Sequence, residues 1–307
     1  MDYYIVLAGG VGAAKFIEGL VDVVDPSQLK IIINTGDDIE LFGLKICPDI
    51  DIITYTLAGL VDKQKGWGFR EETFNCLNML KRYYDQGWFN TGDKDLATHI
   101  YRTDLFKQGY SKTEITSQIA KKLGVKAHLI PMCNEDVQTY LETDIGIIHF
   151  EEYYIKHECS PTIKNIIYRG IKNAKLPNMI SQYLDKAKKV IICPSNPIVS
   201  IGTILNVPGF RDLLNKVKEK VYGISPIVQG ATIKGPADKL MASLDLDVSC
   251  VGVANYYQDI LGHFIIDLKD RSQKKEIEKL GIKVSCFDTI MESMVKKKNL
   301  AQFLIDL

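Results

Sequence analysis

The chain has 307 residues, of which 46% are hydrophobic, so it is long enough for one large globular domain or two small ones. Its 38 Lys and Arg residues balance its 38 Asp and Glu residues, which argues against a protein that binds nucleic acid through the phosphate backbone. No apolar run is long enough to cross a bilayer, no signal-peptide pattern opens the chain, and seven scattered cysteines are typical of the reducing cytoplasm.

The N-terminal segment predicts a βαβ unit. Residues 3–7 form a continuous apolar run that ends at Gly9 and Gly10, which is typical of a strand buried on both faces. Apolar residues then recur at helical spacing as far as Val24, and residues 31–33 form a second buried strand. Two parallel strands joined in this way require a right-handed crossover.

The middle of the chain follows different patterns. Residues 54–125 are mainly helical, with an apparent helix from residue 54 and a capping box at Ser111. Residues 126–185 contain short strand-like runs, beginning at 127–130. We expect both segments to be insertions that cover the carboxyl edge of a sheet, where α/β proteins bind ligands.

Alternation of strands and helices returns late in the chain. Strand-like runs occupy residues 190–193, 221–224, 263–266 and 282–285, and a helical stripe lies at 210–217. Alternation at both ends predicts an α/β fold with one open, doubly wound, mostly parallel sheet. We therefore expect a single domain with its core at about 1–53 and 186–307.

A glycine-rich loop follows the first strand. Gly9, Gly10 and Gly12 let backbone N–H groups approach an anion at the start of a helix, and Lys15 adds a positive charge one turn later. A dinucleotide fingerprint would need a small residue at Lys15, and a Walker loop needs Gly-Lys-Ser/Thr, so an NAD-dependent oxidoreductase is disfavoured. A plain glycine turn with a solvated lysine is the alternative, but the place of the loop favours phosphate binding.

Four carboxylates fall within 15 residues near the same predicted edge. Asp37 and Asp38 follow the second strand, and Asp49 and Asp51 precede the apparent helix at 54. Oxygen ligands of this kind suit Mg²⁺ carried by a diphosphate. An Asx-rich turn and helix caps are the alternatives for the two pairs.

Three further loops carry polar or aromatic residues. The first holds Trp88, Asn90 and His99, whose mixture of aromatic and polar groups suits a flat heteroaromatic ligand, although core packing would also explain it. Ser195 and Asn196 lie in a strand-to-helix turn and offer groups for a phosphate or a ribose. Residues 225–236 form another candidate loop on that edge.

These loops, in this order, resemble the CofD family of 2-phospho-L-lactate transferases, which act in coenzyme F420 biosynthesis. The matching segments are residues 9–15, 34–38, 48–59, 92–99, 130–132, 194–197 and 234–236. The resemblance implies a modified Rossmann-like fold with an inserted helical region and a requirement for Mg²⁺. It also implies transfer of a phospholactyl (or phosphoenolpyruvyl) group from a guanosine diphosphate ester to the ribityl hydroxyl of the deazaflavin FO, with release of GMP.

The resemblance and the residues together assign roles at the expected site. The resemblance implies that Asp51 and Asn90 contact FO, although some relatives carry a basic residue where Asn90 stands. Asp51 would also orient or deprotonate the attacking hydroxyl. The other expected roles are FO contact by Trp88 and His99, catalysis by Asp37 and Asp38, metal binding by Asp37, Asp38 and Asp49, and nucleotide or phosphate binding by Gly9, Gly10, Gly12, Lys15, Ser195 and Asn196.

One other class of protein shares part of this pattern. CofD-like regulatory proteins have the glycine loop and bind UDP-sugars, but the segment 90–99 and the inserted helices favour the transferase. We therefore expect a cytoplasmic enzyme with small-molecule substrates and no nucleic-acid or membrane partner, for which a homodimer is one compatible assembly.

Overall fold

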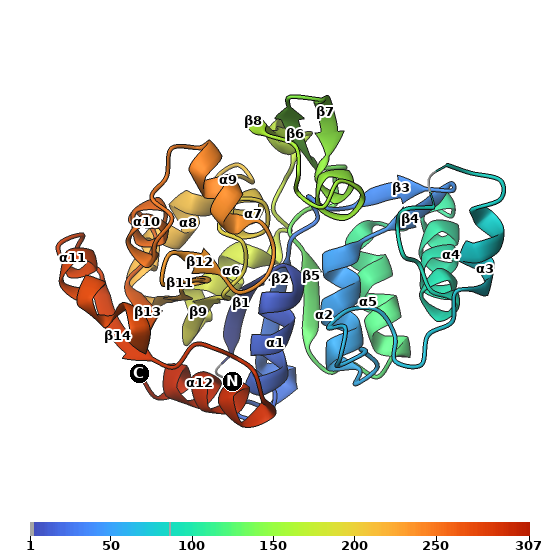
Figure 1. Ribbon diagram of the computed structural model, residues 1–307. Coiled ribbons are helices and arrows are strands. Elements are labelled where there is room, and N and C mark those ends of the chain that lie inside the picture. Colours follow the sequence, from blue (N-terminus) through green and yellow to red (C-terminus); the bar gives the residue numbers. More distant parts are fainter. Residues whose placement is uncertain (1–2, 86) are drawn as a thin grey trace.

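A computed structural model describes residues 3–85 and 87–307 (Figure 1). Its centre is a seven-stranded sheet in the order β14-β13-β10-β9-β1-β2-β5, and every neighbouring pair is parallel. The strands are β1 (Tyr4–Ala8), β2 (Leu29–Ile33), β5 (His128–Pro131), β9 (Lys189–Ile192), β10 (Val221–Ile224), β13 (His263–Asp267) and β14 (Lys283–Phe287). The chain builds outward from β1 to β5, then returns to β9 on the other side of β1. Ligands of open α/β sheets bind where the strand order reverses in this way.

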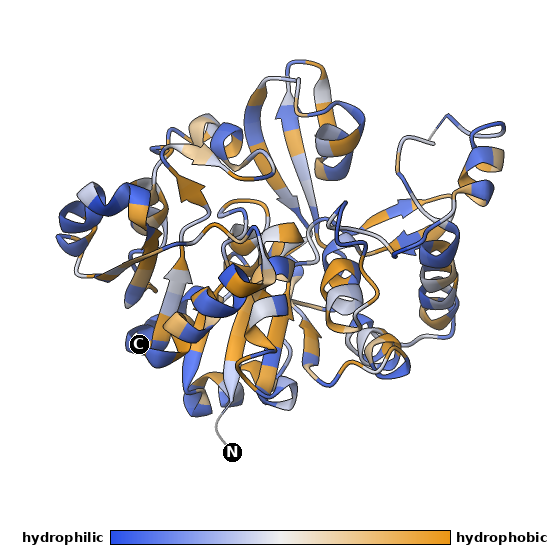
Figure 2. Cartoon of the chain, turned by 60° about the horizontal axis from the view of Figure 1, so that its bottom comes forward, coloured by the Kyte–Doolittle hydropathy of each residue, from blue (hydrophilic) through white to orange (hydrophobic). Residues whose placement is uncertain are grey.

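Helices cover both faces of this sheet, which confirms the predicted doubly wound α/β fold. One face packs on α1 (Gly10–Leu20), α2 (Pro48–Leu57), α5 (Lys112–Lys122) and α12 (Met294–Asp306). The other packs on α6 (Met179–Lys186), α7 (Ile201–Leu205), α8 (Phe210–Lys216), α9 (Ala237–Ser243), α10 (Cys250–Tyr256) and α11 (Lys274–Glu278). Figure 2 shows the apolar strands enclosed between these layers.

Alternate residues of each strand enter different cores. In β1, Ile5 and Leu7 belong to the core beneath α7 and α8, whereas Tyr4 and Val6 belong to the core beneath α1 and α12. Because side chains of a strand point alternately to the two faces, a strand covered on both sides must be apolar throughout. That requirement explains why the strands of this sheet are continuous hydrophobic runs in the sequence.

Helices α1 and α12 cross in backbone contact. A Cβ atom on Gly19 of α1 would lie only 2.4 Å from the carbonyl carbon of Lys297. The Lys297 amine also pairs with Glu18 at 2.6 Å. Helix α12 therefore packs directly on the helix whose first turn carries the glycine loop.

Smaller elements surround the carboxyl edge of the sheet. A three-stranded antiparallel sheet, β7-β6-β8, stands above it (Figure 1). The remaining strands are β3 (Ile39–Leu41), β4 (Leu44–Ile46), β6 (Gln138–Thr143), β7 (Gly146–His149), β8 (Ile163–Arg169), β11 (Ile227–Val228) and β12 (Ala231–Thr232), and the remaining helices are α3 (Asn75–Leu80) and α4 (Asp93–Lys107). Short 3₁₀ or π-helical segments are η1 (Pro26–Gln28), η2 (Glu152–Lys156), η3 (Ile171–Asn173), η4 (Lys218–Lys220) and η5 (Leu268–Gln273).

Two details of the predicted inserted region are wrong. Residues 127–130 are predicted to join the short strands of the insertion, but β5 pairs in parallel with β2 and forms one edge of the central sheet. A four-residue apolar run does not reveal which sheet it joins. The helix predicted from residue 54 begins at Pro48 instead, so Asp49 and Asp51 lie in its first turn.

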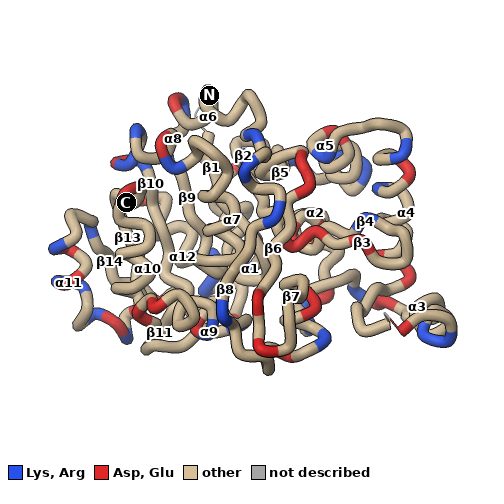
Figure 3. Tube along the Cα trace, turned by 90° about the horizontal axis from the view of Figure 1, so that it is seen from above, with Lys and Arg blue, Asp and Glu red and all other residues tan. Residues whose placement is uncertain are grey.

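Two further observations concern the surface and the helices. Figure 3 shows basic and acidic residues interspersed along the trace in that view, in agreement with the balanced composition. None of the helices in the described part of the chain combines the length and apolarity that a membrane crossing requires.

Candidate active site

A large cavity of about 570 Å³ lies where the carboxyl ends of the central strands meet. Loops that follow β1, β2, β9, β10 and β14 contribute to it, together with α2, α4 and the turn after β7. The predicted site residues that line it are Gly9, Gly10, Gly12, Lys15, Asp37, Asp49, Asp51, Asn90, His99, Ser195 and Asn196. The topology therefore brings eleven of the thirteen predicted residues to one cavity; Asp38 and Trp88 are the other two.

The glycine loop is shaped by its neighbours in the fold. A Cβ atom on Gly12 would lie 2.2 Å from the carbonyl oxygen of Pro194, and one on Gly9 would lie 2.7 Å from a carboxylate oxygen of Asp49. Gly10 has a φ of 70°, which favours glycine. The loop glycines thus allow the first turn of α1 to approach α2 and the turn after β9.

The first turn of α1 presents N–H groups to the cavity. The first N–H groups of a helix have no acceptor within the helix, and no side chain of the loop caps α1. One of these groups, the Gly10 N–H, donates to Asp49 Oδ1 at 2.7 Å. Nearby, the Ser195 hydroxyl is buried and has no hydrogen-bond partner among the described residues. These donors are suited to a phosphate.

Three buried carboxyl groups, Asp37, Asp49 and Glu151, line the cavity beside the glycine loop. Asn34 positions one of them, since its amide donates to Asp49 Oδ2 at 2.9 Å while its oxygen accepts from the Gly36 N–H at 2.8 Å. Asp37 Oδ1 is buried without a hydrogen-bond partner among the described residues. The sequence gives no sign of Glu151, because it follows β7, an antiparallel strand of the inserted region.

Burial raises the pKa values of these three carboxyl groups, and neighbouring negative charges add to the rise. Burial raises the pKa of Glu151 to about 8, and the charge of Asp49 adds to the rise. Burial raises the pKa of Asp49 to about 6, although hydrogen bonds from Asn34 and Gly10 oppose the rise. Burial and the charges of Asp49 and Glu151 raise the pKa of Asp37 well above its usual range. These carboxyl groups offer oxygen donors of the kind that Mg²⁺ prefers, but among the described residues three ligand atoms come within 4.8 Å of one another at Asp51, Asp95 and His99, not here.

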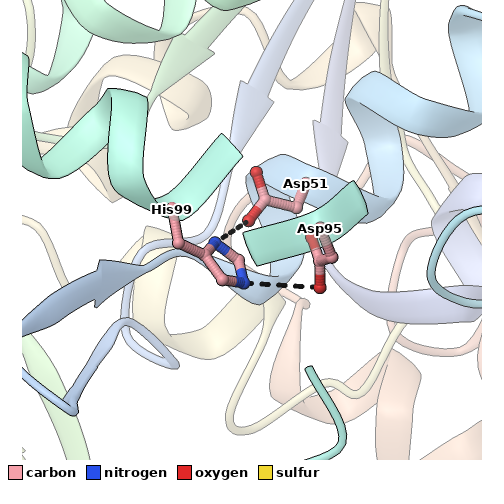
Figure 4. Close-up of side chains that lie close together, drawn as sticks. All are labelled: Asp51, Asp95 and His99. Atoms are coloured by element: carbon pink, nitrogen blue, oxygen red, sulfur yellow. Dashed lines mark ion pairs between the residues drawn. The ribbon is translucent and has the colours of Figure 1, made fainter. Parts of the chain in front are cut away.

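A second cluster joins α2 to α4 at another part of the cavity wall. Figure 4 shows His99 between two carboxylates: its Nδ1 lies 3.7 Å from Asp51, and its Nε2 lies 3.3 Å from Asp95. Asp95 and His99 are four residues apart and therefore share a face of α4. One ligand atom from each of the three residues lies within 4.8 Å of the others, so the group could also hold a metal ion.

Arg102 and Tyr55 complete this cluster. Arg102 is buried, forms an ion pair with Asp51, and lies 3.2 Å from His99 Nδ1. The Tyr55 hydroxyl donates to Asp95 at 2.7 Å. Burial raises the pKa of Asp51, and the charges of Arg102 and His99 oppose this. Arg102 is absent from the predicted site, but its spacing from Asp95 and His99 along one helix face would have revealed it.

The two predicted residues outside the cavity have other contacts. Asp38 is buried and pairs with Lys112 at 2.6 Å, so a lysine from α5 compensates its charge. Trp88 packs against Phe89 with the rings 5.9 Å apart and nearly perpendicular. Phe89 lines the cavity, whereas Trp88, the aromatic residue predicted to do so, does not. The aromatic residues that line the cavity are Tyr55, Trp67, Phe89, Phe150 and Tyr154.

Comparison with known proteins gives consistent matches along nearly the whole chain. Residues 4–299 match the family described as 2-phospho-L-lactate transferase CofD. The chain is 36% identical to a 2-phospho-L-lactate transferase of Methanosarcina mazei, over 98% of this chain and 99% of that protein. It is 37% identical to a phosphoenolpyruvate transferase of Streptomyces griseus, over 99% of this chain and 97% of that protein.

A solved structure shares the fold. The crystal structure of a UPF0052 family member from Bacillus halodurans aligns with a TM-score of 0.64 at 15% identity, covering 99% of this chain and 98% of that one. At this level of identity the match concerns the architecture of the sheet and its insertions.

Proposed function

This chain belongs to the 2-phospho-L-lactate transferase CofD family, and from that premise we propose the reaction and its substrates. The proposed donor is a guanosine diphosphate ester that carries lactate or enolpyruvate. The proposed acceptor is the ribityl hydroxyl of FO. Attack of this hydroxyl on the phosphorus that bears the three-carbon acid releases GMP and forms a phosphodiester, the precursor of coenzyme F420 that lacks glutamates.

One observation carries the proposal: the start of α1 and the Asp51 cluster line the same cavity. A nucleotide donor needs an anion site, and an alcohol acceptor needs a group that orients its hydroxyl. The volume of about 570 Å³ is of the size that small-molecule sites have in proteins. Both substrates would therefore lie in one space, as a direct transfer between them requires.

The donor would lie along the glycine loop. Amide groups of the first turn of α1 would face its diphosphate, and the turn with Ser195 and Asn196 would hold further phosphate or ribose oxygens. Carboxylates among Asp37, Asp49 and Glu151 would hold Mg²⁺ jointly with the diphosphate, because Mg²⁺ is usually bound by one or two carboxylates together with substrate phosphates. A bound cation there would offset the negative charge of the diphosphate and of the departing GMP.

The acceptor would lie against the second cluster. Asp51 would accept a hydrogen bond from the FO hydroxyl and take its proton as the new P–O bond forms. The ion pair with Arg102 would hold the carboxylate in position for this contact. Asn90, with its amide on the cavity wall, and Phe89, whose ring replaces the expected Trp88, would contact the ring system.

Mass spectrometry of a reaction mixture tests the proposal. The purified chain is incubated with FO, Mg²⁺ and either the lactyl or the enolpyruvyl diphosphoguanosine. We expect GMP together with a deazaflavin phosphodiester whose mass identifies the preferred acid. Binding of a UDP-sugar with no turnover of either donor would contradict the transferase and support the regulatory class instead.

A further inference from the structure

The charges on the cavity wall are strongly unequal. Six acidic residues line the cavity: Asp37, Asp49, Asp51, Asp95, Glu151 and Glu292. Within the described parts of the chain, Lys15 and Lys234 are the only lysine or arginine residues that line it. The proposed donor carries negative charge on its diphosphate and on the carboxylate of its acid. An anion in such a cavity needs compensating positive charge.

The two lysines approach the same end of α1 from different parts of the chain. Lys15 lies four residues after Val11 and thus on the same face of α1. Side chains of a helix lean toward its N-terminus, so the Lys15 amine extends toward the first turn. Lys234 belongs to the loop between β12 and α9. A Cβ atom on Gly66 would lie 3.5 Å from Val11 Cγ1 and 3.8 Å from Lys234 Nζ, which places the second amine close to that turn.

Neither amine forms an ion pair with a carboxylate of the described residues. Lys234 donates only to the carbonyl oxygen of Lys65, at 3.4 Å. Burial lowers the pKa of Lys234, and the charge of Lys15 contributes to the decrease. Two like charges that face one cavity repel each other, and an anion bound between them would remove that repulsion.

We propose, building on the function above, that Lys15 and Lys234 form an oxyanion site for the donor. The ligand chemistry is a phosphate or carboxylate oxygen, and the donor offers two sources. One is the phosphate that bears the acid, and the other is the carboxylate that lactate and enolpyruvate share. Recognition of a carboxylate would suit both lactate and enolpyruvate. A relative named as a 2-phospho-L-lactate transferase is 36% identical to this chain, and one named as a phosphoenolpyruvate transferase is 37% identical.

Substitution of each lysine by methionine tests this site. The variants are Lys15→Met, Lys234→Met and the charge-keeping Lys234→Arg, with Lys216→Met as control, because Lys216 is exposed and lies outside the cavity. Calorimetry measures binding of GDP and of the lactyl diphosphoguanosine, and steady-state assays give KM for donor and FO. We expect both methionine variants to weaken donor binding about 10-fold to 100-fold, the typical effect of losing a charged hydrogen bond.

The comparison of ligands identifies the source of the oxyanion. Equal weakening for GDP and the ester assigns the lysines to the diphosphate, and weakening for the ester alone assigns them to the carboxylate. In both cases we expect Lys234→Arg to keep most of the affinity for the donor and Lys216→Met to bind the donor as the wild type does. The KM for FO should be unchanged in every variant.

Two other results are decisive. A Lys234→Met enzyme that binds GDP and the ester as the wild type does would overturn the oxyanion site and leave the transferase standing. If Lys234→Met weakens GDP binding but the wild type forms no product, the oxyanion site is retained and the proposed reaction is overturned.

Discussion

Replacing Glu151 by glutamine should stabilise the folded protein at alkaline pH. Burial raises the pKa of Glu151 from 4.5 to about 8. Between these values the folded state binds the proton that the unfolded state has lost. The favourable contribution of neutral Glu151 is therefore complete below about pH 4.5 and is lost as the pH rises through about 8. A glutamine has no proton to lose, so the variant should not share this decline.

The pKa shift sets the size of the effect. One pKa unit corresponds to about 1.4 kcal/mol, so the shift of Glu151 gives a ceiling of about 5 kcal/mol. Asp37 and Asp49 share the same repulsion, and a group of interacting carboxyls titrates as a unit. We therefore expect the free energy of unfolding of Glu151→Gln to exceed that of the wild type by about 1–3 kcal/mol at pH 8.5 and by about zero at pH 5.

Urea unfolding at the two pH values measures this difference. Glu219→Gln serves as the control, because Glu219 is exposed and outside the cavity. Added Mg²⁺ should stabilise the wild type at pH 8.5 and stabilise Glu151→Gln less, if the three carboxyls hold the cation. The reasoning is refuted if Glu151→Gln and the wild type lose the same stability between pH 5 and pH 8.5.

Three substitutions test other parts of the site. Asp51→Asn should lower kcat by about 10²- to 10⁴-fold with little change in donor KM, as measured by steady-state kinetics, and full activity would exclude Asp51 as the base. Arg102→Met should cost about 3–5 kcal/mol in urea unfolding because it leaves the buried Asp51 charge unpaired, and a wild-type midpoint would mean that Asp51 is neutral. Gly12→Ala would place a Cβ atom 2.2 Å from the Pro194 carbonyl oxygen. Calorimetric titration should then show that the variant binds GDP more weakly than the wild type does, with a smaller change in FO binding. An unchanged GDP affinity would mean that α1 can move without disturbing the site.

The central sheet could be predicted from the sequence because its strands are buried on both faces. Continuous apolar runs such as residues 31–33 leave little choice of structure. Membership of β5 in that sheet could not be predicted, since hydrophobicity indicates burial and does not identify the partner strand. The start of α2 could have been found from Pro48, because proline is favoured at the first position of a helix.

The candidate site was predictable where its residues follow strands of the central sheet. Asp37 follows β2, so topology alone brings it to the cavity. Its neighbour Asp38 pairs with Lys112, a partner 74 positions away that no local pattern reveals. Glu151 enters from the small antiparallel sheet, and Arg102 from the third turn of α4. Lys112 and Glu151 reach these positions through tertiary packing, which short sequence patterns do not encode, whereas the helical spacing of Arg102 from His99 is readable in the sequence.

The crossing of α1 and α12 has a consequence during synthesis on the ribosome. The glycine loop is synthesised well before the helix that packs behind it at Gly19, since that helix spans Met294–Asp306. Domains fold as units once their contacts are available, so α1 lacks this support until the chain has been synthesised through α12. Nascent chains that stop before α12 would therefore expose the apolar side of α1, including Phe16 and Leu20, to chaperones.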